Sequence, residues 1–461
     1  SDWGSPIFDT LGLDDPQAPV TVTGHVYVQD AGNPGERNEK SAAKGLAGVC
    51  VSDGAQVVAT DADGAFRMRN VTPGLQRFVF ASTPTGYRVG GAFYRKIPLK
   101  TGDFSIDFTL TPDPAASRAN HRFAHITDTH GCGGDMIAAL QPDDIPFAII
   151  TGDLCNDASD TALFAAFKAQ LDRAQIPVLT VPGNHDIYAA GGGALVTRAF
   201  LAQKRESAKK PAAEPEAPEL YEDFFGPSYY SFNYGGRHYV MLNSMAEWTR
   251  QRDWLAQDLA HCAPGTEILI FQHYPPTPAE MEYFSQFTVR AIFFGHTHAD
   301  LVAQRGKMLC VNSVGLAHSR DLSPLTVRVA SFEGAELHLA NRTPGYGDQA
   351  TLPPLPRPAE TAPAIRTAQD WRHFKADSAR SGCGTDAAKP PFVLAWTTDL
   401  GGATYIGSPV LSGGVLYTGV GDRQNRGSSG VYALEPATGN ILRRTQTGPF
   451  PALAADTATI L

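Results

Sequence analysis

Short segments that alternate apolar and polar residues dominate the first quarter of the chain. Val20–Val28 places an apolar residue at nearly every second position, the pattern of a strand with one buried face. Turn residues such as Asp61-Ala62-Asp63-Gly64 separate it from similar segments. These segments are Gly48–Val51, Gln56–Thr60, Ala65–Arg69, Gln76–Ala81 and Phe104–Leu110. The pattern predicts a β-sandwich over residues 19–112, preceded by a tail over residues 1–18.

Residues 120–345 have a different pattern, in which apolar runs alternate with segments of helical period. The predicted strands are His121–Thr127, Phe147–Thr151, Pro177–Val181, His238–Leu242, Glu267–Phe271 and Val289–Phe294. Ala162–Ala174 and Trp248–Ala260 have the period of helices. This alternation predicts a layered α/β domain. Within it, the polar stretch Gln203–Pro218 is expected to be an excursion on the surface.

The last part of the chain returns to short strands. Residues 346–366 are rich in proline and predict a linker. After Trp371, two alternating segments stand out, Gly414–Gly419 and Gly430–Leu434. Residues 367–461 number 95 (461 − 367 + 1), which at roughly 40–45 residues a blade is enough for about two blades of a propeller.

Both flanking regions resemble known modules. The strands and turns of residues 19–112 resemble the carboxypeptidase-regulatory-like, transthyretin-like or Ig-like β domain that precedes some bacterial phosphoesterases. The segments after Trp371 resemble a blade of a pyrroloquinoline-quinone-type β-propeller. Because propellers need about four blades or more, this resemblance implies first blades only, in a native chain that continues beyond Leu461.

Composition and charge narrow the class of protein to which the chain can belong. Gly (45) and Pro (34) are frequent, as in a turn-rich, strand-rich protein. No apolar run reaches the roughly 18–20 residues that span a bilayer, so no transmembrane segment is predicted. The net charge of −9 argues against a nucleic-acid surface. The chain starts at Ser1 without a signal peptide, which leaves a removed leader or an engineered start as alternatives.

The six cysteines lack the spacing of a zinc site. They are Cys50, Cys132, Cys155, Cys262, Cys310 and Cys383. Buried, unpaired thiols are the favoured interpretation. Cys132 and Cys155 stand two residues after His130 and Asp153, which are considered below as metal ligands. A disulfide between the two cysteines is therefore the alternative.

Five short polar motifs follow predicted strands of the α/β region, in chain order. They are Asp128-Thr129-His130, Gly152-Asp153-Leu154-Cys155-Asn156-Asp157, Gly183-Asn184-His185-Asp186, Gln272-His273 and Gly295-His296-Thr297-His298. Loops that follow parallel strands meet at one edge of a sheet, so we expect these motifs to converge on one site.

The residue types indicate a pair of transition-metal ions. In extended chain, residues i and i+2 point the same way, so Asp128 with His130 and His296 with His298 each offer two ligands to one side. Asp153 is the best candidate for a carboxylate that bridges two cations, and Asn184 offers a neutral oxygen. Imidazole with carboxylate suits Mn, Fe, Zn, Ni or Co, in divalent or mixed-valence form. Two divalent cations, two carboxylates and one hydroxide leave about one net positive charge, which suits an anionic phosphate.

The five motifs together resemble the calcineurin-like metallophosphoesterase superfamily, over about residues 120–345. The resemblance implies a four-layer α/β/β/α sandwich and two metal sites. Asp128, His130, Asp153 and His298 would hold one metal, and Asp153, Asn184, His273 and His296 the other. A hydroxide that bridges the metals would attack phosphorus in line, and His185 would contact the phosphate and protonate the leaving oxygen.

Three residues within the motifs either distinguish this chain from subgroups of the superfamily or are expected to support the ligands. Serine/threonine phosphatases of the superfamily carry an Asp-Arg pair where Asn156 and Asp157 stand, and purple acid phosphatases carry a tyrosine ligand at the Asn156 position. Both subgroups are therefore disfavoured. In several relatives an aspartate at this position orients the catalytic histidine, which Asn156 can do only without charge. Asn156, Asp157 and Asp186 are the candidates for residues behind the ligands.

Several residues have a plain structural interpretation beside a functional one. His125 lies within the first strand of the domain, and packing or support behind the ligands is favoured. His318 fits the rim of the site and an ordinary loop equally well. Tyr188, Tyr229 and Tyr230 fit core roles better than a substrate pocket.

The sequence thus predicts hydrolysis of a phosphomonoester or phosphodiester, on a small-molecule, glycan or nucleotide substrate. The motif set resembles the bacterial branch with cyclic-nucleotide and glycerophosphodiester phosphodiesterases. A nucleotidase or sugar-nucleotide pyrophosphatase is the rival within enzymes. A propeller-based binding protein with a secondary phosphoesterase module is the rival from another class. The two β modules favour an extracytoplasmic, bacterial location.

Overall fold

The computed structural model describes the greater part of the chain. The described residues are 18–29, 44–90, 92–99, 102–189, 195–196, 201, 220–318, 325–343, 347–350, 395–401, 404, 409–420 and 430–446. They belong to two compact units, Ser1–Leu352 and Pro353–Leu461. Within the described part, no helix is long and apolar enough to cross a membrane. The predicted N-terminal tail up to residue 17, the excursion at 203–218, Trp371 and Cys383 lie outside the described residues.

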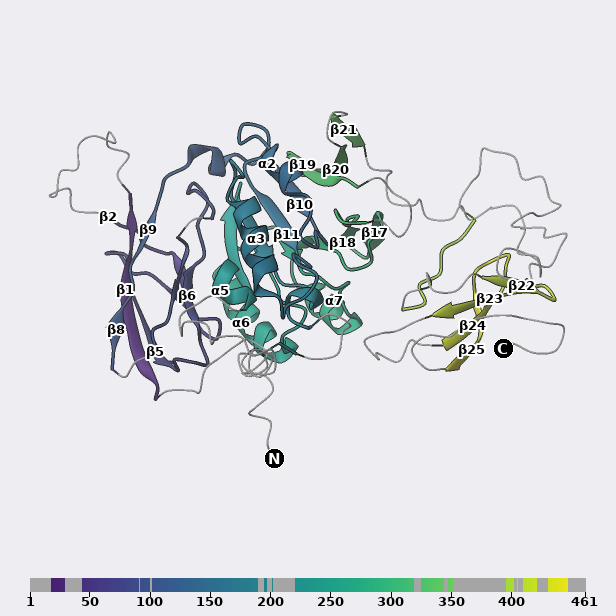
Figure 1. The fold of residues 1–461 in the computed structure, drawn as a ribbon, viewed down its shortest axis with the longest axis horizontal. Coiled ribbons are helices and arrows are strands. Elements are labelled where there is room, and N and C mark those ends of the chain that lie inside the picture. The colour runs from purple at the N-terminus through teal and green to yellow at the C-terminus, as the bar shows by residue number, and fades with distance from the viewer. Residues whose placement is uncertain are drawn as a thin grey trace. The chain divides into compact units, whose positions relative to one another are not determined.

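Two small sheets form the N-terminal part of the first unit (Figure 1). One is built around β1 (Val20–Val28), which pairs with β2 (Lys44–Gly45), β5 (Ala65–Val71), β8 (Phe104–Ser105) and β9 (Phe108–Leu110). The other has the order β4 (Val57–Ala59), β3 (Cys50–Ser52), β6 (Phe78–Ala81) and β7 (Tyr94–Lys96). Their apolar side chains share one core, including Val22, Phe108 and Val79.

Each predicted segment contains a strand here, but β2 and β7 were not predicted and the last segment is interrupted. Val20–Val28 is observed with the predicted bounds. Phe104–Leu110 is instead two short strands, both parallel to β1. The break has a local cause, because the side chain of Asp107 accepts the His25 N–H at 2.8 Å in place of a backbone carbonyl. The resemblance to a carboxypeptidase-regulatory-like domain stays a prediction.

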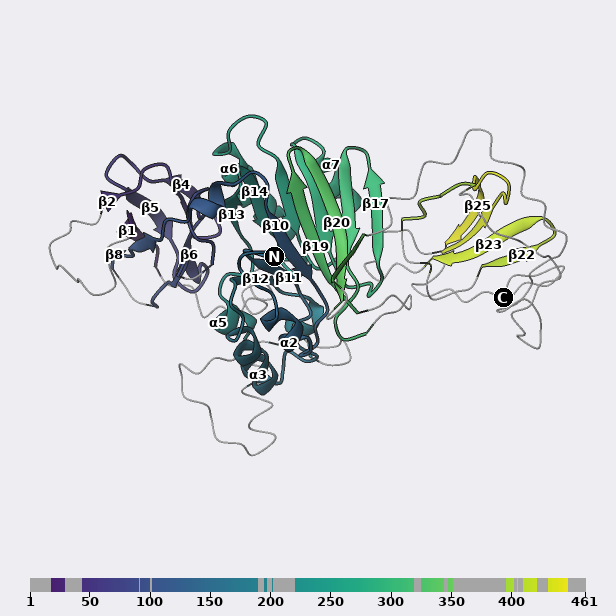
Figure 2. The ribbon, with the colours of Figure 1, turned by 90° about the horizontal axis from the view of Figure 1, so that it is seen from above.

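The first six-stranded sheet of the α/β part has the order β12-β11-β10-β19-β20-β21. Its strands are β10 (Arg122–Ile126), β11 (Ala148–Thr151), β12 (Val178–Val181), β19 (Val327–Glu333), β20 (Glu336–Thr343) and β21 (Gly347–Ala350). β10, β11 and β12 are parallel, and β19 to β21 continue the sheet antiparallel. Figure 2 shows β10, β19 and β20 side by side.

The second six-stranded sheet has the order β13-β14-β15-β16-β18-β17. Its strands are β13 (Tyr230–Tyr234), β14 (Arg237–Met241), β15 (Ile268–Phe271), β16 (Val289–Phe294), β17 (Leu301–Arg305) and β18 (Met308–Asn312). The four central strands, β14, β15, β16 and β18, are parallel, and both edge strands are antiparallel.

Side-chain alternation places the two sheets face to face. Phe123 and Ile149 of the first sheet share a core with Tyr239, Phe271 and Phe293 of the second. The opposite face of the first sheet packs on helices α2 (Gly134–Ala138), α3 (Thr161–Leu171) and α5 (Tyr221–Phe225). The second sheet packs on α6 (Trp248–Ala260) and α7 (Pro278–Phe284). Helices, sheet, sheet and helices therefore follow one another, and the predicted α/β class is confirmed. Both sheets contain parallel and antiparallel strands.

The predicted linker was wrong at its start. Residues 346–366 were expected to be linker, but Gly347–Ala350 is a strand that pairs antiparallel with β20. The remaining linker residues lie outside the described part. Extended backbone next to an open sheet edge gains ladder hydrogen bonds, which the composition of the stretch does not reveal.

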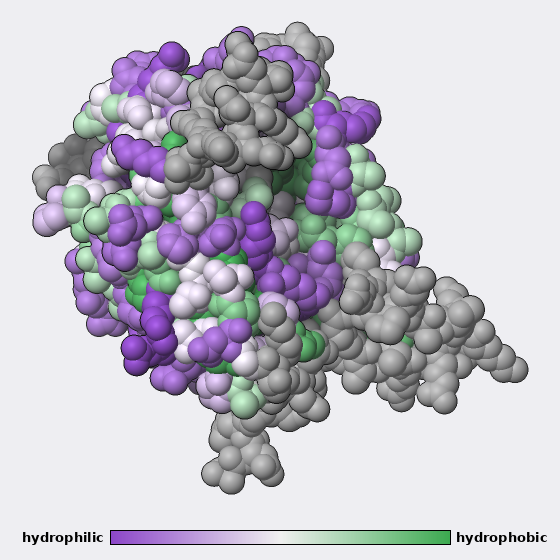
Figure 3. Space-filling view, turned by 90° about the vertical axis from the view of Figure 1, so that its left-hand side faces the viewer, coloured by the Kyte–Doolittle hydropathy of each residue, from purple (hydrophilic) through white to green (hydrophobic). Residues whose placement is uncertain are grey.

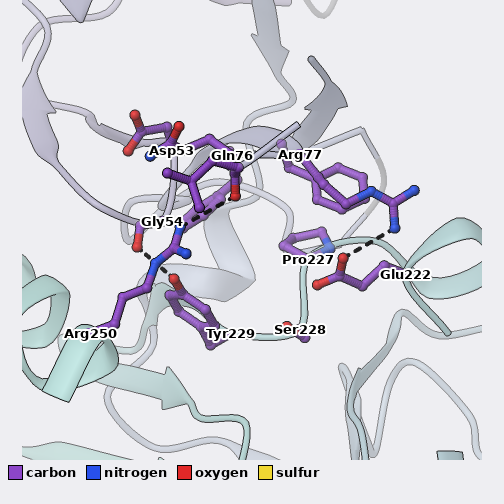
Figure 4. Close-up of a pocket in the computed structure, with 12 residues that line it drawn as sticks. Asp53, Gly54, Gln76, Arg77, Glu222, Pro227, Ser228, Tyr229 and Arg250 are labelled. Carbon is purple, nitrogen blue, oxygen red and sulfur yellow. Dashed lines mark hydrogen bonds and ion pairs between the residues drawn. The ribbon is translucent and has the colours of Figure 1, made fainter. Parts of the chain in front are cut away.

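The N-terminal sheets dock on the α/β part through buried polar bonds as well as apolar packing. The Tyr229 hydroxyl donates to the Gly54 carbonyl at 2.6 Å, and the Trp254 indole donates to the Ser52 hydroxyl at 3.1 Å. Arg77 reaches Glu222 and Asp223 of α5 at 3.3 and 2.6 Å. The cavity between these groups, about 30 Å³, holds little more than one water (Figure 4). Tyr229 therefore has the core role that was favoured.

The outer face of the N-terminal sheets is predominantly hydrophilic. In Figure 3 hydrophobic residues appear only as small patches between hydrophilic ones. This agrees with β1, where buried and half-buried positions alternate.

The second unit contains one four-stranded antiparallel sheet among its described residues. Its order is β22 (Val410–Ser412), β23 (Val415–Val420), β24 (Gly430–Leu434) and β25 (Ile441–Gln446). Val420, Tyr432 and Leu434 form its small core, against which Trp396 packs. No closed propeller is present in the described part, so the propeller stays a prediction.

We predict that Arg77→Met destabilises the first unit by about 3–5 kcal/mol, because two buried carboxylates lose their cation. Lys96→Met is the matched control, since Lys96 also reaches Asp223, at 3.4 Å, but its side chain is 61% exposed. The control is expected to change stability by less than about 1 kcal/mol. Urea unfolding curves measure both variants. Equal, small effects of the two substitutions would contradict a stabilising role for the buried ion pairs of Arg77 with Glu222 and Asp223.

Candidate metal centre

The five polar motifs meet at one edge of the two sheets, as the sequence predicted. Asp128 follows β10, Asp153 follows β11 and Asn184 follows β12, all at the carboxyl ends of parallel strands. His273 follows β15 and His296 follows β16 in the second sheet. Because the sheets are stacked, two rows of strand ends face each other across the site.

Four residues form one group of converging ligand atoms. Asp128, His130, Asp153 and His298 each place one such atom within 4.8 Å of the others, and all four are buried. The Asp128 Oδ1 lies 3.2 Å from the His298 Nε2. The Asp153 Oδ2 lies 3.9 Å from the His130 Nε2. This group can hold one cation.

A second group shares Asp153 with the first. Asp153, His273 and His296 also place ligand atoms within 4.8 Å of one another. The His273 Nε2 lies 3.3 Å from the Asp153 Oδ2 and 3.1 Å from the Asn184 Oδ1. The Asp153 carboxylate therefore lies between the two groups, which is where a bridging ligand has to be.

The backbone at these residues differs from the prediction. Extended chain was expected to align residues i and i+2, but five of the seven candidate ligands have left-handed backbone. Their φ values are 50° at Asp128, 45° at His130, 52° at Asp153, 68° at His296 and 55° at His298. Such residues cost of order 1 kcal/mol each or more and cluster at functional sites. The motifs converge at the sheet edge as predicted, whereas the extended backbone expected at the i and i+2 pairs was wrong.

Glycines allow the ligand loops to approach this closely. A Cβ on Gly183 would lie 2.3 Å from both the backbone nitrogen and the Oδ1 of Asp153. A Cβ on Gly295 would lie 1.7 Å from the Thr127 hydroxyl and 2.5 Å from the Asp128 Oδ2. These motif glycines are therefore steric requirements of the site rather than turn residues alone.

Hydrogen bonds fix which ring atom two of the histidines, His273 and His298, present to the site. The His273 Nδ1 contacts the Thr151 carbonyl at 2.8 Å, and the His298 Nδ1 contacts the His318 carbonyl at 3.1 Å. A carbonyl only accepts, so both Nδ1 atoms carry the proton and both Nε2 atoms are left for a cation.

Hydrogen bonds also orient the Asp128 carboxylate. The Asp128 Oδ2 accepts from the Thr127 hydroxyl and from the His296 N–H, both at 2.8 Å. The Asp128 Oδ1 and both ring nitrogens of His130 are buried without a hydrogen-bond partner. Buried polar atoms are rarely left so, and these three face the first group. The donor set therefore fits a cation.

His185 lies beside the first group, and its ring is oriented by a backbone atom. Its ring centroid is 4.9 Å from that of His130. Its Nδ1 donates to the backbone carbonyl of Asn156 at 2.9 Å, which leaves the Nε2 edge for a substrate. The side-chain amide of Asn156 instead donates to the His130 carbonyl at 3.4 Å. The predicted support from Asn156 therefore comes from its main chain.

Asp186 and Asp157 accept hydrogen bonds that hold the loops carrying the second and third motifs. The buried Asp186 carboxylate accepts backbone N–H groups of Gly183, Leu154 and Cys155 at 2.9 to 3.1 Å. It thereby ties the second and third motifs together. Asp157 accepts from the backbone and the hydroxyl of Ser159 at 2.8 and 2.7 Å, which is a local turn.

The electrostatics of the metal-free cluster reflect buried carboxylates. Burial raises the pKa of Asp128, and the Asp153 charge adds to this. Burial would lower the pKa of His273, but the Asp153 carboxylate raises it to about 9. His273 in turn holds the pKa of Asp153 low, against the effect of burial. Burial lowers the pKa of His130 to about 4, so this imidazole is neutral near pH 7.

Several supporting residues were not predicted from the sequence. Thr127 orients Asp128, and the Ser244 hydroxyl accepts the His273 N–H at 3.1 Å. His125 is buried and bridges the hydroxyls of Ser313 and Thr151 at 2.7 and 2.8 Å, which agrees with the favoured role in packing or support. Small hydroxyl residues at strand ends next to the motifs were the only available signal.

The five described cysteines form no disulfide, so the alternative bond between Cys132 and Cys155 is absent. Cys155 is buried and Cys132 is exposed. Burial was therefore the wrong expectation for Cys132, and also for Cys50 and Cys262, which are only partly buried.

Comparison with known families agrees with this geometry. Residues 121–300 match the family model described as calcineurin-like phosphoesterase. Residues 121–300 form a calcineurin-like phosphoesterase domain. Residues 34–113 match the model described as the N terminal of calcineurin-like phosphoesterase, so the N-terminal sheets belong with this domain. The protein is a hydrolase of phosphate esters.

Individual relatives are distant. No curated protein matched the chain. A purple acid phosphatase from yellow lupin seeds is 15% identical, with a TM-score of 0.36, over 74% of this chain and 69% of that one. The phosphopantetheinyl hydrolase of Mycobacterium tuberculosis is 14% identical, with a TM-score of 0.28, over 50% of this chain and 99% of that one. These likenesses are too low to indicate a substrate or a metal.

We predict that metal affinity rises with pH up to about pH 9. His273 has a pKa of about 9 in the metal-free protein, so a cation must displace its proton at lower pH. Between pH 6.5 and 8.5 the apparent affinity should rise by up to about tenfold per pH unit. Competition with a chelator of known affinity measures it. A flat profile would contradict a protonated His273.

Proposed function

We propose that this phosphoesterase binds two divalent transition-metal ions and hydrolyses a phosphomonoester or phosphodiester. The observation that carries the proposal is the pair of ligand groups that share Asp153. Asp128, His130, Asp153 and His298 hold one ion, and Asp153, Asn184, His273 and His296 hold the other. When bound, such ions supply Lewis acidity toward phosphate oxygens and lower the pKa of water.

The protein's own contribution is orientation. Thr127 and the His296 N–H hold one Asp128 oxygen, so that the other faces the site. The carbonyls of Thr151 and His318 hold His273 and His298 in the tautomer that binds a cation. Left-handed backbone at five ligands keeps these atoms in place before any ion arrives. Pre-organisation of this kind lowers the cost of binding and of the transition state.

His185 is proposed as the proton donor to the leaving oxygen. It lies beside His130 but is in neither group of converging ligand atoms. The Asn156 carbonyl anchors its Nδ1, so its Nε2 is the atom that delivers a proton. A positioned acid of this kind contributes about 10²–10⁴-fold to the rate.

The substrate is proposed to be a small-molecule phosphate ester, of which a nucleotide or a sugar nucleotide is the second candidate. Mono- and diesters require the same centre, so the ligands alone favour neither. Two partly or fully exposed imidazoles, His185 and His318, lie beside His130, with ring centroids 4.9 and 5.8 Å from its own.

The central test is metal analysis together with hydrolysis of para-nitrophenyl phosphate and of its bis-ester. We expect about two ions per chain and turnover of at least one ester. Asp153→Ala removes the carboxylate shared by both groups and should abolish most metal binding and turnover. The proposal fails if the metal-loaded protein cleaves neither ester and Asp153→Ala keeps the same metal content.

We predict that His185→Ala keeps both metals but lowers kcat by about 10²-fold or more. Asn156→Ala is the matched variant, because it removes the neighbouring side chain and leaves the carbonyl that orients His185. It should stay within about fivefold of the parent in kcat. Metal loss in His185→Ala would instead make His185 a ligand, and an equal loss of turnover in both variants would exclude orientation by the main chain.

A further inference from the structure

His318 lies at the centre without belonging to either ligand group. It was expected to line the rim or to be an ordinary loop residue, and the structure places it at the rim. Its ring stacks on that of His298, with centroids 4.0 Å apart and an interplanar angle of 24°. It also lies 5.8 Å from the His130 ring. His318 itself is exposed, whereas His298 and His130 are buried or nearly so.

The loop that carries His318 is fitted tightly to the ligands. The Leu316 and Ala317 N–H groups donate to the Thr127 and Asp128 carbonyls, each at 3.2 Å. A Cβ on Gly315 would lie 2.7 Å from the His298 Nδ1 and 2.8 Å from the Asp128 Cβ. The position of His318 is therefore set by the same contacts that set Asp128 and His298.

The contact that supports His298 does not need an imidazole at position 318. The His298 Nδ1 donates to the main-chain carbonyl of His318, and every residue has such a carbonyl. Stacking alone would also be served by another aromatic ring. What only a histidine adds here is a ring N–H on an exposed residue beside the candidate ligands His130 and His298.

We propose that His318 is a substrate-binding residue that donates a hydrogen bond to a non-bridging oxygen of the bound phosphate. This inference rests on the proposed function, because it requires phosphate at the ligand groups. His130 neighbours both rings, with the half-buried His185 at 4.9 Å and the exposed His318 at 5.8 Å. His185 serves the leaving oxygen, and His318 holds an oxygen that stays on phosphorus.

Three substitutions separate this role from mere support of His298. His318→Ala removes both the ring and the donor. His318→Phe keeps a ring that can stack but has no N–H, and His318→Asn keeps an N–H donor without the stack. His261→Ala is the control, since His261 is an exposed histidine that ends α6.

The measurements are metal content, the Kd for inorganic phosphate on the metal-loaded protein, and KM and kcat with para-nitrophenyl phosphate. We expect His318→Ala and His318→Phe to raise the phosphate Kd and KM about tenfold or more, the usual effect of losing a hydrogen bond to a charged group. Metal content should not change, kcat should change by less than about threefold, and His318→Asn should recover part of the affinity.

Two outcomes would overturn the inference. Unchanged phosphate affinity in His318→Ala means that His318 touches no phosphate. Metal loss in His318→Ala that His318→Phe restores means that the ring only supports His298. Failure of the proposed function is a separate result, seen as absence of turnover in the parent protein. The phosphate Kd values then still decide the role of His318.

Discussion

Asp128 and Asp153 are almost completely buried, and their carboxylates face the imidazoles of the same cluster. Buried charge without compensation costs several kcal/mol, so this cluster needs either protons or cations. In the metal-free protein, His273 carries part of the compensation, which is why its pKa rises to about 9. The unpartnered Asp128 Oδ1 and His130 ring show where compensation is still lacking. The rest of the architecture keeps these groups together despite that cost.

Two features of the fold hold the buried Asp128 and Asp153 carboxylates close together. Stacked sheets bring the ends of two sets of parallel strands to one edge, and an extensive aromatic core between the sheets fixes their separation. Besides the cost of buried charge, the site carries backbone strain, because five candidate ligands have left-handed φ values. Core burial at about 25 cal/mol per Å² can offset such terms in a unit of this size. Backbone strain and two buried carboxylates thus coincide where metal chemistry is proposed.

The N-terminal sheets are part of this structural unit. Phe80 and Phe93 enter the same core as the second sheet, and Arg77 binds two acidic residues of α5. α5 also packs in the core beneath the first sheet. The docked sheets therefore brace the layers that carry the ligands, whereas the cavity at their interface is too small for a substrate.

The sequence by itself determined the elements, their class and the order of the motifs. Apolar periodicity reports burial locally, so strands such as β1 and β16 and the helix α6 were predicted with their observed bounds. It also determined the residue types at the strand ends, and hence that His and Asp side chains suited to a metal ion would gather there. These properties depend on neighbours in the chain, which the sequence displays directly.

Only the tertiary structure decided how these residues meet. It showed that left-handed backbone aims Asp128 and His130, that a main-chain carbonyl orients His185, and that His318 stacks on His298. It also extended the sheet into the predicted linker through β21. Each of these features depends on an atom or a sheet edge supplied by a distant part of the chain. Sequence periodicity carries no record of such a partner, because the physical constraint exists only once the sheets are stacked.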